Sequence, residues 1–215
     1  FNNNDVPGVM NANAAKHYLN RYGVISGQNI TLATNNDSVY GTALELAKAG
    51  SNISIIDSRS SVRNEITEEL SNNNIELILG RVPYNINGKK SVHNIELINS
   101  NLENSNHKHQ VNSDLVLLSG GWSPVVHLLS HRGVKPKWDN ENLCFVPDKI
   151  KEPITVAGSA SGIWGTEDCV ASGVAAGLKA AKSLGLKTTD YFFPKRGGWK
   201  NPIQPLYEIK YKKNR

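Results

Sequence analysis

The chain has few sulfur-containing residues and no long apolar run. Its two cysteines, Cys144 and Cys169, lie far apart and form no Cys-x-x-Cys pair, which excludes a redox-active dithiol. We expect both to be small buried residues in a protein of the reducing cytoplasm. Hydrophobic residues make up 39% of the sequence without a stretch long enough to cross a bilayer, so no membrane contact is expected. The chain begins at Phe1 and its single methionine is Met10, so we expect a piece of a longer protein.

Positive charge is in excess, and much of it is concentrated near the C-terminus. The net charge is +5, and the segment Lys195–Arg215 is rich in lysine and arginine with Glu208 as its one acid. A nucleic-acid partner would call for aromatic residues interleaved with the basic ones on a sheet or a recognition helix, and that pattern is missing. We therefore predict no nucleic-acid binding and interpret residues 191–215 as a connecting linker.

The segment Asn29–Asp57 has the pattern of one β-α-β unit. Apolar strands are predicted around Ile30 and Ile53, with a helix from Ser38 to Ala49 between them. Asp57 ends the second strand, where an acid accepts hydrogen bonds from the ribose hydroxyls of a dinucleotide.

The turn of this unit lacks the glycines that a dinucleotide fingerprint requires. Only Gly41 fits, and the side chains of Asn35 and Asn36 would obstruct a pyrophosphate. Asp37 would add a repulsive charge at the helix start. The pattern favours a Rossmann unit that has lost its nucleotide, and a unit that still binds one remains the alternative.

An antiparallel meander is predicted after this unit, preceded by a helix over residues 62–70 and a strand over residues 75–79. Strands are expected at 81–86 and 91–98, joined by a two-residue turn at Asn87-Gly88. A buried strand at 114–119 follows. At the start of the chain, a helix from about Asn11 to Tyr22 should end at Gly23.

The residues after this last strand predict a turn and another helix. Gly121 and Trp122 lie in the turn, and Ser123 and Pro124 suit the start of a helix that buries its valines and leucines against a sheet. His127 and His131 are four residues apart on this helix, but no third ligand is near in sequence, so we predict no metal site.

The stretch 154–185 combines a strand, a glycine turn and a helix. Ile154 to Ala157 read as a buried parallel strand that ends at Gly158, and a helix with a face of small residues is predicted from Thr166 to Leu184. Such a turn at the carboxyl end of a strand is a usual place for a dinucleotide phosphate.

Two sets of motifs carry a family resemblance. The run Ala157-Gly158-Ser159, followed by Ala171, Gly173 and Ala176-Gly177, resembles the closing motif of the pyridine nucleotide-disulfide oxidoreductases. Over most of the chain, the segments FNNNDVPGVM, TNNDSVYGTALELAKAG, SGGWSPVVHLLS, Trp138-Asp139 and VAGSASG resemble, in this order, the α subunits of heterotetrameric sarcosine oxidases.

The resemblance implies an oxidoreductase complex in which this chain supplies a dinucleotide-binding scaffold. Such complexes oxidise sarcosine to glycine with O2, giving H2O2 and formaldehyde or methylene-tetrahydrofolate. It implies NAD in the complete domain, FAD and FMN in the parent complex, β, γ and δ subunits as partners, and tetrahydrofolate bound by a further domain. Ser159 replaces the family's aspartate, so NAD rather than tightly held FAD is expected at the 158–165 turn.

The expected fold is an α/β FAD/NAD(P)-binding Rossmann-like domain with an antiparallel meander, incomplete at both ends. Residues 1–28 would come from a first dinucleotide-binding half, 29–119 would form the Rossmann-like domain, 120–190 the closing strand and helix, and 191–215 the linker. No catalytic residue is assigned. A stand-alone NAD(P)H-dependent flavin oxidoreductase and a non-catalytic scaffold of a proline or hydroxyproline dehydrogenase complex remain alternatives. The expected cofactor-binding residues are Asp57, Gly41, Gly121, Trp122, Gly158, Ser159, Ala160 and Gly165.

Overall fold

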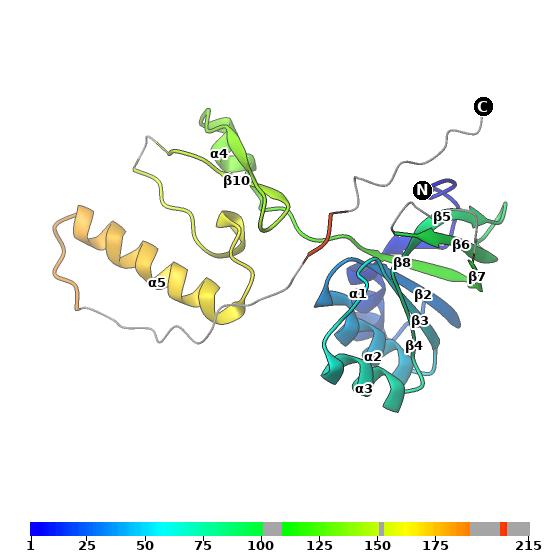
Figure 1. The fold of residues 1–215 in the computed structure, drawn as a ribbon. Coiled ribbons are helices and arrows are strands. Elements are labelled where there is room, and N and C mark those ends of the chain that lie inside the picture. The colour runs from blue at the N-terminus through cyan, green and yellow to red at the C-terminus, as the bar shows by residue number, and fades with distance from the viewer. Residues whose placement is uncertain (101–108, 151–152, 190–202, 206–215) are drawn as a thin grey trace. The chain divides into compact units, whose positions relative to one another are not determined.

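The chain forms two compact units (Figure 1). The computed structural model describes residues 1–100, 109–150, 153–189 and 203–205. Unit 1 comprises residues 1–121 together with the residues from 202 onward, and unit 2 comprises residues 122–201. Residues 1–28, expected to come from a separate half, lie in unit 1 with the rest of the Rossmann-like segment. The linker predicted at 191–215 falls mostly outside the described residues.

A five-stranded parallel sheet forms the centre of unit 1, with the strand order β1-β8-β2-β3-β4. Its strands are β1 (Val9–Asn11), β8 (Leu115–Ser119), β2 (Asn29–Thr34), β3 (Asn52–Asp57) and β4 (Glu76–Leu79). The chain passes from β2 to β3 on one side, whereas β8 pairs with the other side of β2. The topological switch point of the sheet therefore lies between β2 and β8, which is where parallel sheets of this kind bind ligands.

Three helices cover one face of this sheet (Figure 1). Helix α1 (Ala12–Tyr22) begins where the Asn11 side chain accepts the N–H of Asn13. It ends at Gly23, as predicted, and this glycine has a left-handed φ of 64°. Helices α2 (Tyr40–Lys48) and α3 (Asn64–Asn72) follow β2 and β3. The core between helices and sheet contains Ala15, Ile30, Leu32, Ala43, Leu46, Ile53, Ile55, Ile66, Leu70, Leu115 and Leu117.

The predicted meander packs on the other face. Its strands are β5 (Arg81–Asn87), β6 (Asn94–Asn99) and β7 (His109–Asn112), paired antiparallel. Side chains alternate along each parallel strand, so Ile55 enters the helix-side core and Ile56 the meander-side core. The meander-side core contains Ile56, Ile86, Val92, Ile95, Leu97 and Val116.

The two-residue turn predicted at Asn87-Gly88 is wrong. Strand β5 ends at Asn87 and β6 begins at Asn94, so residues 88–93 form the connection. Val92 explains the longer loop, because its side chain is only 2% exposed in the meander-side core and its N–H donates to the carbonyl of Pro7 over 3.0 Å. The loop is therefore shaped by a tertiary contact with the N-terminal segment.

The first residues of the chain join the two sheets of unit 1. The N–H of Asn2 donates to Tyr84 O over 3.0 Å, and the carbonyl of Asn2 accepts the N–H of Ile86 over 3.1 Å. A few residues later, Val9 pairs in parallel with Val116. One short segment thus extends the meander and then forms an edge of the parallel sheet.

The described part of unit 2 contains a hairpin and two α-helices. The hairpin, absent from the sequence prediction, pairs β9 (Pro136–Asp139) with β10 (Cys144–Pro147), and the rings of Trp138 and Phe145 lie 5.1 Å apart across it. Helix α5 (Thr166–Ser183) matches the predicted helix almost residue for residue, and α4 (His127–His131) begins later than predicted. Cys144 is buried as expected, which raises the pKa of its thiol, whereas Cys169 is half-buried.

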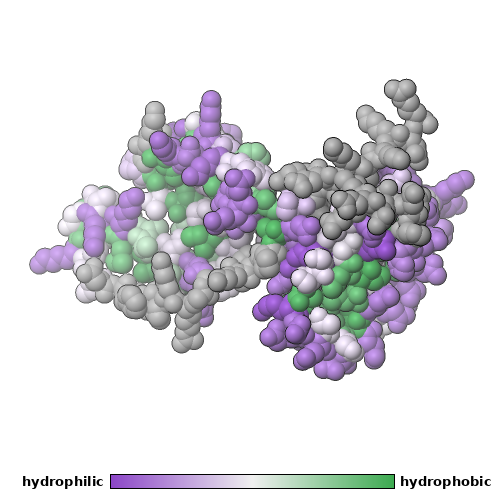
Figure 2. All heavy atoms as spheres, in the orientation of Figure 1, coloured by the Kyte–Doolittle hydropathy of each residue, from purple (hydrophilic) through white to green (hydrophobic). Residues whose placement is uncertain are grey.

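Two predictions of buried elements in unit 2 are wrong. Residues 154–157 form no strand, and Ile154 is 36% exposed. Of the valines and leucines in and before α4, Val125 and Leu128 are exposed, Val126 is half-buried, and Leu129 is buried. The described part of unit 2 holds no parallel sheet against which these residues could pack. Figure 2 accordingly shows hydrophobic residues at the surface of this unit. No helix among the described residues has the length and apolarity needed to span a membrane.

The helix-side core predicts that two leucines of unit 1 contribute very differently to the free energy of unfolding. Leu46 in α2 is fully buried, whereas Leu79 at the end of β4 is 36% exposed. We expect Leu46→Ala to lower the free energy of unfolding by about 2–5 kcal/mol, because the cavity adds to the lost transfer energy. Leu79→Ala should cost less than half as much. Urea unfolding of both variants, followed by circular dichroism, checks this, and equal costs would contradict the described core.

Candidate functional site

The carboxyl edge of the parallel sheet carries hydrogen-bonded hydroxyl side chains at the switch point. Thr34 ends β2 and Ser119 ends β8, and the two are register partners. The Thr34 hydroxyl donates to Ser119 O over 3.2 Å, and the hydroxyls of Ser38 and Ser119 are 3.0 Å apart. The ends of β2 and β8 are therefore tied together directly below the place where a ligand would bind.

The turn after β2 is filled by its own asparagine side chains, as the sequence suggested. Asn35 is 3% exposed and Asn36 is fully buried. The Asn36 side chain accepts the N–H of Ser38 over 3.0 Å and so caps the 3-10 turn Asp37–Val39 that leads into α2. The backbone N–H of Ser38, which a phosphate could use, is therefore already hydrogen-bonded. Gly41 lies in α2, where an added Cβ would meet nothing within 4 Å, so no contact in unit 1 requires a glycine there.

Asp57, expected to face a ribose, lies at the end of β3 with no exposed surface and both carboxylate oxygens occupied. The Tyr40 hydroxyl donates to Oδ2 over 2.6 Å. The guanidinium of Arg59 donates to Oδ1 from Nε over 3.0 Å and to Oδ2 from Nη2 over 2.7 Å. A bidentate pair of this kind is strong and geometrically specific. Asp57 thus anchors the loop that follows β3.

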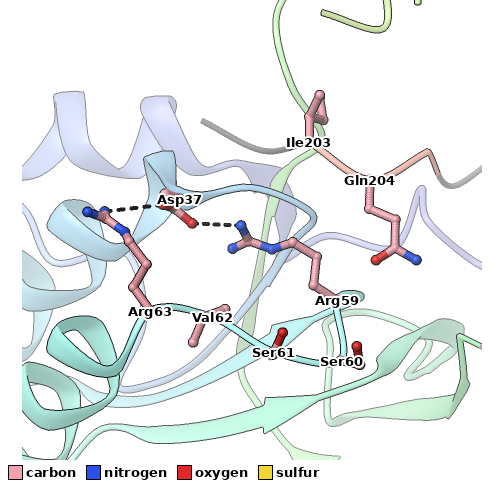
Figure 3. Close-up of a pocket in the computed structure, with 8 residues that line it drawn as sticks. All are labelled: Asp37, Arg59, Ser60, Ser61, Val62, Arg63, Ile203 and Gln204. Atoms are coloured by element: carbon pink, nitrogen blue, oxygen red, sulfur yellow. Dashed lines mark hydrogen bonds and ion pairs between the residues drawn. The ribbon is translucent and has the colours of Figure 1, made fainter. Parts of the chain in front are cut away.

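Arg59 continues the network to the start of α2. It donates to the Asp37 carboxylate over 2.7 Å, and Arg63 reaches the other oxygen of Asp37 over 3.2 Å (Figure 3). Burial lowers the pKa of Arg59, but its hydrogen bonds to Asp57 and Asp37 outweigh this and hold the pKa above its usual value. Two arginines therefore offset the charge of Asp37, which the sequence suggested would repel a phosphate.

An open pocket of about 560 Å³ lies beside this network. Figure 3 shows Arg59, Ser60, Ser61 and Arg63 on one side of it and Ile203 and Gln204 on the other. Near the pocket, the hydroxyl of Ser58 is buried without a hydrogen-bond partner among the described residues. Sequence reasoning missed Tyr40, Arg59 and Arg63. An arginine two residues after the acid that ends a strand was the available signal.

The 158–165 turn of unit 2 brings together most of the remaining predicted residues. Gly158 has φ of 61° and starts a 3-10 turn, and its N–H donates to the Ser172 hydroxyl over 3.1 Å. Ser159 is exposed. Gly165 precedes α5 without a side-chain cap, and the first turn of α5 carries Glu167 and Asp168. The N–H groups at this end of α5 could meet an anion, although the two nearby carboxylates oppose one.

Two further predicted residues, Gly121 and Trp122, follow β8. The ring of Trp122 lies 5.8 Å from that of Trp164, next to the 158–165 turn. Ala160 is part of the 3-10 turn Gly158–Ser161. The predicted residues thus separate into a set in unit 1 and a set in unit 2. Among the described residues, no three His, Cys, Asp or Glu side chains are grouped to hold a metal ion.

Sequence comparison connects the chain to one kind of protein, although no protein-family model matches it. It is 34% identical over 190 residues to sarcosine oxidase subunit alpha of Corynebacterium sp. strain P-1, covering 87% of this chain and 20% of that protein. It is 33% identical over 187 residues to the subunit of the same name from Rhizobium meliloti, covering 86% and 18%. The chain is related to one segment of the sarcosine oxidase α subunit. The resemblance seen in the motifs is confirmed, and the chain spans about a fifth of the length of these α subunits.

Solved structures confirm the predicted fold class of this sarcosine oxidase α-related chain. Thioredoxin reductase from T. acidophilum superposes with a TM-score of 0.54 at 20% identity, covering 81% of this chain and 56% of that one. Thioredoxin reductase from Lactococcus lactis gives 0.55 at 20% identity, covering 73% and 51%. The chain has the FAD/NAD(P)-binding α/β fold of these proteins, with its parallel sheet, helices and antiparallel meander.

The Asp57 network predicts unequal roles for two arginines that share Asp37. The Arg59 side chain is 10% exposed and that of Arg63 is 69% exposed. Arg59→Met leaves the buried carboxylate of Asp57 without its counterion, so we expect a loss of about 3–5 kcal/mol in the free energy of unfolding. Arg63→Met removes a surface ion pair and should cost about 0–1 kcal/mol. Chemical denaturation of the two variants measures the difference, and similar costs would contradict the network.

Tyr40 predicts a loss of stability at alkaline pH. Its burial, together with its hydrogen bond to Asp57, raises the pKa of the phenol well above the ordinary value of 10.0. Above about pH 10 the unfolded chain releases this proton and the folded chain keeps it, so the free energy of unfolding falls as pH rises, by at most about 1.4 kcal/mol per pH unit.

Denaturation between pH 9 and 11 tests the effect of Tyr40. Tyr40→Phe should remove this contribution to the slope. Tyr22→Phe, which deletes the hydroxyl of a 60% exposed ring, is the matched control. An unchanged slope in Tyr40→Phe would contradict the assignment.

Proposed function

We propose that the chain supplies the dinucleotide-binding region of an oxidoreductase complex similar to sarcosine oxidase, with NAD as its ligand. The observation that carries the proposal is the parallel sheet whose switch point lies between β2 and β8, beside the open pocket at Arg59 and Ser61. The sequence relatives carry the sarcosine oxidase α name, which supports the choice of complex. We assign no catalytic residue.

The residues at this edge of unit 1 fit the adenosine half of a dinucleotide better than the turn sequence suggested. Each side chain counted as an obstacle has a protein partner: Asn35 donates to Gln204 O, Asn36 caps Ser38, and Asp37 is paired with arginine. The hydroxyls of Ser60 and Ser61 line the pocket and could meet ribose oxygens. The exposed guanidinium of Arg63 could approach a phosphate. When bound, the nicotinamide cofactor would supply hydride-transfer capacity, and the residues named here would bind and orient it.

In the proposed complex, this region acts as a scaffold among β, γ and δ subunits. FAD and FMN would be held elsewhere in the assembly, and tetrahydrofolate by a further domain of the subunit. The parent reaction would be oxidative demethylation of sarcosine in the cytoplasm. The 158–165 turn stays a second candidate for the NAD pyrophosphate, because the N-terminus of α5 has no side-chain cap.

A pair of serine substitutions distinguishes the two candidate positions. Ser61→Glu places a negative charge on the rim of the unit 1 pocket, and Ser159→Glu places one on the exposed turn of unit 2. We expect Ser61→Glu to weaken NAD binding about tenfold, equivalent to about 1.4 kcal/mol, and Ser159→Glu to leave it unchanged. Calorimetric titration with millimolar NAD measures both. The reverse result would move the site to the 158–165 turn, and equal affinity of the unaltered chain and both variants for NAD would refute the unit 1 pocket as the site.

A further inference from the structure

Residues 203–205 lie across the switch point of unit 1 and contact the residues that follow both of its strands. On the β2 side, the backbone N–H of Gln204 donates to Asn35 O over 3.1 Å, and the Asn35 side-chain amide donates to Gln204 O over 2.7 Å. Both backbone polar groups of Gln204 are therefore satisfied by one residue of the β2 turn. Within the segment 191–215, interpreted above as a connecting linker, Gln204 is thus held against the β2 turn.

On the β8 side, Ile203 lies against a glycine, Gly121. Gly121 has φ of 107°, and a Cβ built on it would lie 2.6 Å from Cδ1 of Ile203. Any other residue at this position would be strained by the positive φ, and its Cβ would force the end of the Ile203 side chain to shift. Glycine at the edge of a dinucleotide site usually permits close approach of the ligand; here it permits close approach of Ile203.

We infer that residues 203–205 act as an intramolecular occupant of the dinucleotide crevice, and that NAD binds in unit 1 only when this segment leaves. The inference rests on the proposed function. It explains why the side chain of Asn35, at the turn where a pyrophosphate would lie, is engaged with the chain itself. Ile203 and Gln204 also form one wall of the pocket, so their departure would open it toward the switch point.

Residues 203–205 and NAD therefore compete for the same crevice, and the competition can be measured as a change in the affinity for NAD. A ligand that binds only the open form has its apparent affinity reduced by the fraction of molecules that are open. By reciprocity, bound NAD must displace residues 203–205 to the same extent. Weakening the segment should therefore tighten NAD binding, and adding NAD should expose the backbone of Gln204.

The test uses the full chain and one matched pair of variants. Ile203→Ser removes the packing on Gly121, and Ile25→Ser alters an isoleucine of unit 1 that is 42% exposed in the segment before β2. We expect Ile203→Ser to lower the Kd for NAD about tenfold and Ile25→Ser to leave it unchanged. If Ile203→Ser folds poorly, Gln204→Pro replaces it, because proline lacks the N–H that donates to Asn35.

Hydrogen exchange of the Gln204 amide in the unaltered chain gives a second readout. Faster exchange in the presence of NAD supports the inference. Equal Kd values for the unaltered chain and Ile203→Ser, or unchanged or slower exchange at Gln204 with NAD bound, would overturn it while leaving the proposed function intact. Failure of every variant to bind millimolar NAD would instead refute the proposed function, and the inference with it.

Discussion

The structure of unit 1 at the carboxyl edge of its parallel sheet depends on the buried ion pair between Asp57 and Arg59. Asp57 has no exposed surface, and its carboxylate accepts hydrogen bonds from Tyr40 in α2 and from Arg59 in the loop after β3. A buried carboxylate is tolerated only with such partners. The pair therefore fixes the position of Arg59, which in turn holds Asp37 at the start of α2. Strand β3, its following loop and α2 are thereby joined at one point.

Because of this ion pair, Asp57 at the end of the second strand has a structural role. In dinucleotide-binding units such an acid faces the ribose. In this chain the acid is buried and paired with an arginine two residues later. The pocket is lined by serines and arginines of the same loop. Recognition of an adenosine group would then rely on neutral hydroxyls and on an exposed guanidinium.

The fold was largely predictable because its signals are local. Short apolar runs and a terminal glycine located β2, β3, β8 and α1 to within a residue or two. The failures came from contacts between distant parts of the chain. Val92 packs beside the N-terminal segment and lengthens a loop that looked like a two-residue turn, and Gln204 bonds to Asn35 across most of the sequence. The strand expected at 154–157 failed because an apolar run becomes a strand only where a partner edge is available.

The position of β1 and β8 at one side of the sheet bears on how the chain folds as it is synthesised. Val9 pairs with Val116, and Ile30 with Leu115, so these pairings close loops of roughly a hundred residues, a separation that slows folding. Strands β2, β3 and β4 can pair as soon as they emerge. The second edge of β2 and the whole of β1 stay unpaired until β8 has been synthesised. During that interval they are exposed to wrong pairing, which makes the emergence of residues 115–119 the committing step in the biogenesis of unit 1.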